Sequence, residues 1–141
     1  MPKIIPDNTL IVVADGHKAI LFRNEGSGDR FSLHEEARLS PKDLMDDGPS
    51  GSRPEDQTPR QTDEATFAKQ LAKRLYVLKQ GGKFDAFILF ADPQTLGQLR
   101  DTIHKTVEAS LMLAVDKDLT NNPVADIADA VKKAMKGLVG R

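Results

Sequence analysis

Four aspartates stand within three residues after the end of an apolar run, where carboxylates often bind cations or transfer protons. Asp15 follows "LIVVA", Asp92 follows "FILFA", and Asp116 and Asp118 follow "LMLAV" within the motif "DKDLT". These are the candidate catalytic residues. Each also has a structural interpretation. Asp15 stands in a hairpin-turn pattern, Asp92 precedes Pro93 as a helix N-cap does, and the "DKDLT" pair suits capping or an ion pair. We favour the structural roles.

A second set of candidates is basic and lies in two predicted helices. Lys69 and Lys73 have the i,i+4 spacing that places two side chains on one helix face. Solvated helix faces carry such lysines too, and a formal net charge of −1 gives no global attraction to nucleic acid. RNA contact is therefore a local hypothesis, carried by Lys69, Lys73, Arg74, Lys79, Lys132, Lys133 and Lys136.

Several other chemistries are not expected. The chain has no cysteine, which excludes disulfides, thiolate zinc sites and cysteine nucleophiles. His17, His34 and His104 lack metal-ligand spacing and are interpreted as surface residues, so no metal site is predicted. Ser50 and Ser52 lack the strand-turn-helix context of a serine nucleophile. No Walker or dinucleotide-binding glycine pattern occurs, and no cofactor is predicted.

The first elements expected are strands. In "TLIVVADGHKAILFR", two apolar runs flank Asp15-Gly16, which predicts a hairpin with a type I′ turn. A third strand is expected in "RFSLHEEARL", where Glu35 interrupts an apolar face. That strand should be half exposed and close to a sheet edge. Its alternating apolar residues are Phe31, Leu33, Ala37 and Leu39.

Residues 40–62 form a polar segment with four prolines and two glycines. Such a composition buries too little apolar surface to offset its ordering entropy, so it predicts a long mobile loop. The loop is either a partner-contact segment or a tolerated insertion. A helix is then expected from Thr62 or Asp63 to the Gly81-Gly82 pair.

The second half of the chain alternates strands and helices. The run "FDAFILFA" predicts a central strand covered on both faces, and "SLMLAV" predicts a fifth strand. In the helix that begins at Pro93, we expect Gly97 to permit close packing on the sheet. Asn122 should cap a last helix that Pro123 opens and Gly137 ends. Its inward residues should be Val124, Ile127, Ala128, Val131 and Met135.

The resulting order, β-β-β-α-β-α-β-α, predicts one α/β domain over residues 1–141 with a single mixed sheet and flanking helices. This is the element order of the ribonuclease H-like fold. Nucleases of that fold hold two metal ions about 4 Å apart with carboxylates from several elements. A metal-dependent hydrolase or nuclease is therefore the alternative function, using Asp15, Glu64, Asp92 and either Asp126 or Asp129.

Four segments, in this order, carry a resemblance to a known family: "VVADGHKAILF", "FAKQLAKRL", "FDAFILFADPQTLGQLR" and "VDKDLTNNPVADIADAV". They resemble the bacterial proteins required for attachment to host cells. That family is similar to the middle domain of archaeal and eukaryotic class-1 peptide-chain release factors. The resemblance covers about residues 9–135 and implies a ribonuclease H-like core.

The resemblance also implies where catalysis would be found. In the release factors, a Gly-Gly-Gln motif before the first long helix positions water at the peptidyl ester. The corresponding segment 40–62 has no such triplet, because Gln57 and Gln61 follow aspartate and arginine. "QGGK" at 80–83 follows the helix and suits a C-cap. Peptidyl-tRNA hydrolysis by this mechanism is therefore not expected.

The sequence thus favours a non-catalytic cytoplasmic binding module, since it contains no signal peptide or membrane span. The expected partner is RNA, the ribosome or a translation protein, with any role in attachment indirect. Two alternatives stay open. One is the carboxylate-based hydrolase, and the other is a regulatory interaction protein that does not contact nucleic acid.

Overall fold

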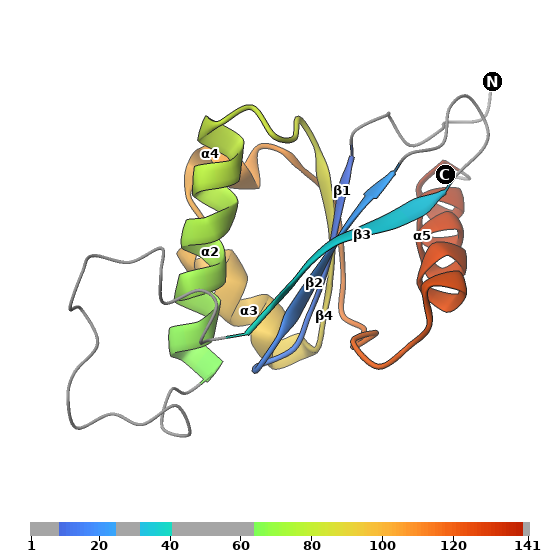
Figure 1. Ribbon diagram of the computed structural model, residues 1–141, viewed down its shortest axis with the longest axis horizontal. Coiled ribbons are helices and arrows are strands. Elements are labelled where there is room, and N and C mark those ends of the chain that lie inside the picture. The colour runs from blue at the N-terminus through green and yellow to red at the C-terminus, as the bar shows by residue number, and fades with distance from the viewer. Residues whose placement is uncertain (1–8, 25–31, 41–63, 140–141) are drawn as a thin grey trace.

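The computed structural model describes residues 9–24, 32–40 and 64–139, and the side chains of the last range from 66 to 135. Figure 1 shows a sheet between two layers of helices. The elements are β1 (Leu10–Ala14), β2 (Ala19–Asn24), β3 (Leu33–Leu39), α2 (Glu64–Gln80), β4 (Phe87–Ala91), α3 (Pro93–Thr102), α4 (Lys105–Glu108), β5 (Leu111–Val115) and α5 (Val124–Val139).

The strands form one mixed five-stranded sheet in the order β3-β2-β1-β4-β5. β2 is antiparallel to both β1 and β3, whereas β1, β4 and β5 run parallel. β1 and β4 are buried along their whole length, as expected of central strands covered on both faces. The prediction of a single mixed sheet with flanking helices is confirmed.

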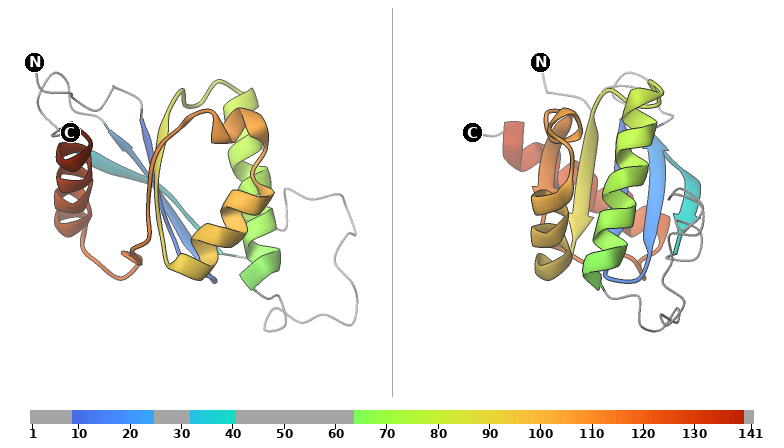
Figure 2. Two further views of the ribbon diagram at one scale, coloured as in Figure 1. Left: turned by 180° about the vertical axis from the view of Figure 1, so that it is seen from behind. Right: turned by 90° about the vertical axis from the view of Figure 1, so that its left-hand side faces the viewer.

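Helices cover both faces of the sheet (Figures 1 and 2). In β1, Leu10 and Val12 pack with α2, α3 and α4, whereas Ile11 and Val13 pack with α5. This alternation follows from the two-residue period of a strand. Among the described elements, α5 alone covers the second face. No helix in the described ranges has the length and apolar character to span a membrane.

The turn between β1 and β2 differs from the prediction. Ala14 pairs with Ala19, which leaves residues 15–18 as the turn, closed by a 2.9 Å hydrogen bond from the Asp15 N–H to the Lys18 carbonyl. The Asp15 carboxylate accepts from the backbone N–H groups of His17 and Lys18 at 2.7 and 2.8 Å. The type I′ prediction is wrong because this carboxylate organises a longer turn. Gly82 is the positive-φ glycine of the described residues.

β3 is an edge strand, as predicted, and contains a β-bulge. The register shifts opposite Leu21 and Phe22, which leaves Glu36 as an extra residue. The bulge moves the following side chains to the other face of the sheet. Leu33 packs on the α5 side and Ala37 on the α2 side, so the alternating residues do not share one face.

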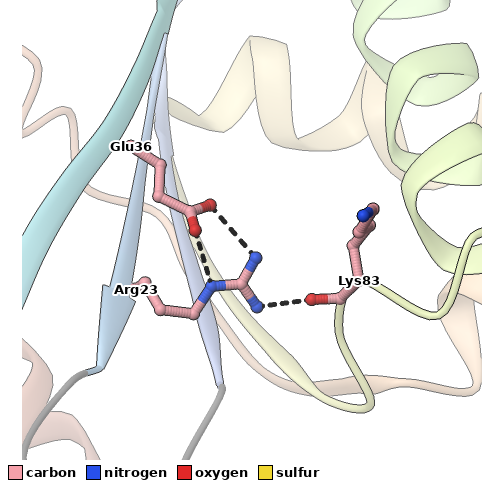
Figure 3. A network of polar contacts seen from close by, with 3 residues as sticks. All are labelled: Arg23, Glu36 and Lys83. Carbon is pink, nitrogen blue, oxygen red and sulfur yellow. Dashed lines mark hydrogen bonds and ion pairs between the residues drawn. The ribbon is translucent and has the colours of Figure 1, made fainter.

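The bulge also supplies a partner for Arg23. Figure 3 shows that the Arg23 guanidinium donates two hydrogen bonds to the Glu36 carboxylate, each 3.0 Å long. Its third nitrogen donates to the Lys83 carbonyl at 2.6 Å. The Arg23 side chain is 12% exposed and that of Glu36 is 37% exposed. This clamp joins β2, β3 and the segment after α2.

The observed ends of α2 and α3 agree in part with those predicted from the sequence. α2 ends before the predicted glycine pair, and Gly82 has a φ of 69°, as a left-handed C-cap requires. α3 begins as predicted, with Asp92 as N-cap and Pro93 in the first turn. Gly97 is exposed, and a Cβ atom there would meet open space, so the prediction of close packing at Gly97 is wrong. The short helix α4 was not predicted.

α5 differs from the predicted helix at both ends. It begins at Val124, and the Pro123 carbonyl accepts the first helical hydrogen bond from Ile127, which places Pro123 rather than Asn122 at the N-cap. Gly137 lies inside the helix because one glycine costs only about 1 kcal/mol and does not by itself end a helix. Val124 is 40% exposed instead of inward. The buried stripe is Ile127, Val131 and Met135.

The predictions for Phe31, for segment 40–62 beyond Ser40 and for a helix start at Thr62 or Asp63 lie outside the described residues.

Candidate functional site

Two of the four candidate aspartates meet at one edge of the sheet. Because β1, β4 and β5 are parallel, their carboxyl ends share this edge. The Thr120 hydroxyl oxygen lies 3.0 Å from Asp15 Oδ2 and donates to Asp118 Oδ1 at 2.6 Å. Thr120 is buried, and its backbone N–H donates to the same Asp118 oxygen at 3.0 Å. The cluster joins the β1–β2 turn to the segment after β5.

The other two aspartates are not part of this cluster. Asp92 Oδ2 accepts from the Thr95 N–H at 3.2 Å, which is the N-cap bond of α3. Asp116 is exposed. One Asp15 oxygen accepts from two backbone N–H groups of the turn, and the other lies 3.0 Å from the Thr120 hydroxyl oxygen. The geometry therefore matches turn and capping roles rather than a catalytic pair.

The metal-binding alternative gains no support. Within the described ranges, no three histidine, aspartate or glutamate side chains are arranged to hold a metal ion. Asp126 and Asp129 are exposed on α5. The side chain of Glu64 lies outside the described residues.

The basic residues of α2 line a groove. It has a volume of about 340 Å³ and lies where α2 meets the end of α3 and the start of α4. We call it the α2 groove, and no acidic side chain is among its lining residues. They are Lys69, Ala72, Lys73, Tyr76, Thr102 and His104.

Two aromatic rings form one wall of the α2 groove. The ring centroids of Tyr76 and His104 are 4.6 Å apart and the ring planes meet at 44°. His104 is the N-cap of α4, and its Nδ1 accepts from the Thr106 N–H at 3.1 Å. A ring nitrogen that accepts carries no proton, so the neutral imidazole has its proton on Nε2. Nε2 is therefore a hydrogen-bond donor.

Both groove lysines are exposed, and in the described part of the chain neither has an ion-pair partner. Lys69, Lys73 and Tyr76 follow i, i+4, i+7 spacing, so they share one face of α2. The sequence identified the two lysines. It missed Tyr76, which the same spacing would have added, and it missed Thr102 and His104 because they come from other elements.

The remaining basic candidates lie elsewhere. Arg74 is half-buried and does not line the α2 groove. Lys79 places its ammonium nitrogen 5.9 Å from the centroid of the Phe84 ring. Lys132 and Lys133 are exposed on α5, on the opposite face of the sheet (Figure 2). The side chain of Lys136 lies outside the described residues.

Comparison with known proteins assigns the family. The model of the bacterial archaeo-eukaryotic release factor family 12 matches residues 8–131. The chain belongs to this family. The match includes the α2 groove and the cluster of Asp15, Asp118 and Thr120. It confirms the release-factor resemblance found in the sequence. No curated protein matches the chain.

Proposed function

We propose that this release-factor family domain is a non-catalytic module that binds RNA through the α2 groove. The observation that carries the proposal is the composition of the groove. Lys69 and Lys73 stand beside an aromatic pair, without acidic neighbours in the lining and without ion-pair partners in the described ranges. Lysines without partners can displace the counterions of a phosphate backbone, which is the main source of RNA affinity.

Two further observations support a non-catalytic role. The Gly-Gly-Gln triplet that the release-factor resemblance implies is absent from the sequence. The candidate carboxylates Asp15, Asp118 and Asp92 accept hydrogen bonds that hold a turn, a loop and the start of α3.

The wider context of the proposal is translation. Membership of a release-factor family supports a translation-related partner such as the ribosome. Such a partner requires a cytoplasmic location, and any link to host attachment is then indirect, through gene expression. The sheet order β3-β2-β1-β4-β5, with β2 antiparallel to both neighbours, supports a ribonuclease H-like arrangement.

The test is co-sedimentation with ribosomes from the protein's own source, at low and high salt. We expect association at low salt that weakens at high salt. The double variant Lys69→Glu/Lys73→Glu should abolish it. The matched control is Lys132→Glu/Lys133→Glu, which changes the net charge equally on the opposite face and should bind like the wild type.

A quantitative form of the test uses a labelled single-stranded RNA and fluorescence anisotropy. For single strands, the logarithm of affinity falls with the logarithm of salt by about 0.7 per neutralised phosphate. Neutral substitution at Lys69 and Lys73 should reduce that slope by about 0.7 to 1.4. No binding at low salt, or equal loss in both double variants, would refute the proposal. Circular dichroism verifies that each variant is folded.

A further inference from the structure

The α2 groove offers two kinds of contact to one ligand. Its lysines provide positive charge, and its Tyr76–His104 wall provides aromatic surface. A nucleotide has the matching parts, an anionic phosphate and a flat base joined by a sugar. A protein segment with a phosphorylated side chain would use the charge but would leave the aromatic wall without a matching partner.

The charged side of the groove suits a single phosphate. Lys69 and Lys73 are one helical turn apart on the same face of α2, so their flexible side chains can converge on one anion. Both are exposed, so their ammonium groups are available to a ligand.

The aromatic side suits an unpaired base. Tyr76 is half-buried and packs against the core, which fixes its ring in place, while His104 is exposed. Stacking of one base on an aromatic side chain raises affinity roughly 5- to 150-fold. The Nε2–H of His104 adds a donor that can reach a base or sugar oxygen. Because Nδ1 accepts from the Thr106 N–H, Nε2 is the ring nitrogen that can donate to the ligand.

The size of the groove limits the ligand. Its volume of about 340 Å³ is at the lower end of the range for small-molecule sites, roughly 300–1,000 Å³. Bases within an RNA duplex are stacked on their neighbours and paired, so they are not free to stack on a protein ring. The groove is therefore suited to one nucleotide from a single-stranded region.

We infer that the α2 groove binds one unpaired nucleotide of RNA, with its base against the Tyr76–His104 pair and its phosphate between Lys69 and Lys73. This inference rests on the proposed RNA-binding function and specifies the part of RNA that is recognised. It predicts a preference for single-stranded over duplex RNA of the same sequence. It also predicts that the isolated nucleotide binds, although more weakly than an oligonucleotide.

The chain supplies a specific probe of this site. Tyr76 is the single tyrosine and the sequence contains no tryptophan, so tyrosine emission reports on the α2 groove alone. Titration with adenosine 5′-monophosphate should quench the emission to saturation. Adenosine without phosphate should bind at least tenfold more weakly. Ribose 5-phosphate should cause little quenching but should compete with the nucleotide. N-acetyl-tyrosinamide, titrated in parallel, corrects for light absorbed by the adenine.

Variants separate the two halves of the ligand. Lys69→Gln/Lys73→Gln should weaken the nucleotide at least tenfold and leave adenosine nearly unchanged. His104→Asn keeps a side-chain cap on α4 but removes the ring, and it should weaken both ligands by about fivefold. In the anisotropy assay with single-stranded RNA, Tyr76→Phe should bind like the wild type. Tyr76→Leu, with its fold verified by thermal unfolding, should bind at least fivefold more weakly.

The results distinguish this inference from the proposed function. Suppose that RNA binds in a Lys69- and Lys73-dependent way, but Tyr76 emission does not change and Tyr76→Leu binds as well as Tyr76→Phe. The proposed function then stands and the nucleotide inference is refuted. Equal affinity for single-stranded and duplex RNA also refutes the inference. Absence of RNA binding at low salt refutes the proposed function itself.

Discussion

Thr120 is a buried residue whose hydroxyl lies between two carboxylates, 2.6 Å from Asp118 and 3.0 Å from Asp15. Thr120→Val keeps the shape of the side chain but removes the hydroxyl that lies between the two carboxylates and donates to Asp118. A hydrogen bond to a charged group contributes about 1.5–3 kcal/mol. Because the Thr120 N–H still bonds to Asp118, we expect a loss of about 1.5 kcal/mol in the free energy of unfolding, measured with urea.

Two variants serve as controls for Thr120. Thr120→Ser keeps the hydroxyl but removes one buried methyl group, so it should cost about 0.8 kcal/mol, less than Thr120→Val. Asp116→Asn changes an exposed carboxylate of the same motif and should lie within about 0.5 kcal/mol of the wild type. A Thr120→Val protein as stable as the wild type would show that the shared hydroxyl contributes nothing.

At the scale of single residues, sequence patterns identified the members of the site that lie on one helix. Lys69 and Lys73 were predictable because i,i+4 spacing is a property of the helix itself. The contact between Asp15 and Thr120 spans 105 positions, and no local pattern encodes it. The same holds for His104, whose place beside Tyr76 depends on how α4 packs against α2.

Among the elements, α3 has a glycine that it does not need for packing. Gly97 is exposed, and a Cβ atom there has nothing within 4 Å. Glycine in a helix interior costs about 1 kcal/mol relative to alanine, mainly through backbone entropy. Gly97→Ala should therefore raise the free energy of unfolding by about 0.5–1 kcal/mol, measured with urea. A lower stability would mean that Gly97 has a contact outside the described residues.

Elements marked by strong local chemistry were predictable. The continuous apolar run of β4 and the Asp92-Pro93 start of α3 both rest on neighbouring residues, and so does the glycine end of α2. The bulge in β3 was not predictable because it depends on the register against β2. The β1–β2 turn was mistaken because the Asp15 carboxylate, which bonds to two backbone N–H groups, stabilises a turn that needs no left-handed glycine.

At the scale of the whole molecule, Arg23 joins three segments that are distant in sequence. Its guanidinium bonds to Glu36 in β3 and to the Lys83 carbonyl after α2. Arg23→Met keeps the apolar stem but removes the bonds to Glu36 and to the Lys83 carbonyl. We expect a loss of about 1–2 kcal/mol in unfolding free energy, limited because Glu36 is 37% exposed and can be solvated by water.

Arg23→Lys tests whether geometry or charge matters in this clamp. An ammonium group cannot form the two parallel bonds to Glu36 and also reach the Lys83 carbonyl. The lysine variant should therefore recover less than half of the stability lost in Arg23→Met, measured by the same urea titration. Full recovery would indicate that a positive charge alone is sufficient.

The two faces of the sheet are covered by helices from different parts of the chain, and this affects folding during synthesis. The sheet face that contains Ile11, Val13, Ile20 and Phe22 is covered, among the described elements, only by α5. From the end of β2 at Asn24 to the start of α5 at Val124 is about 100 residues. At 5–20 residues per second, synthesis of that length takes roughly 5–20 s. During that time the nascent chain exposes an apolar surface to which chaperones and other unfolded chains can bind.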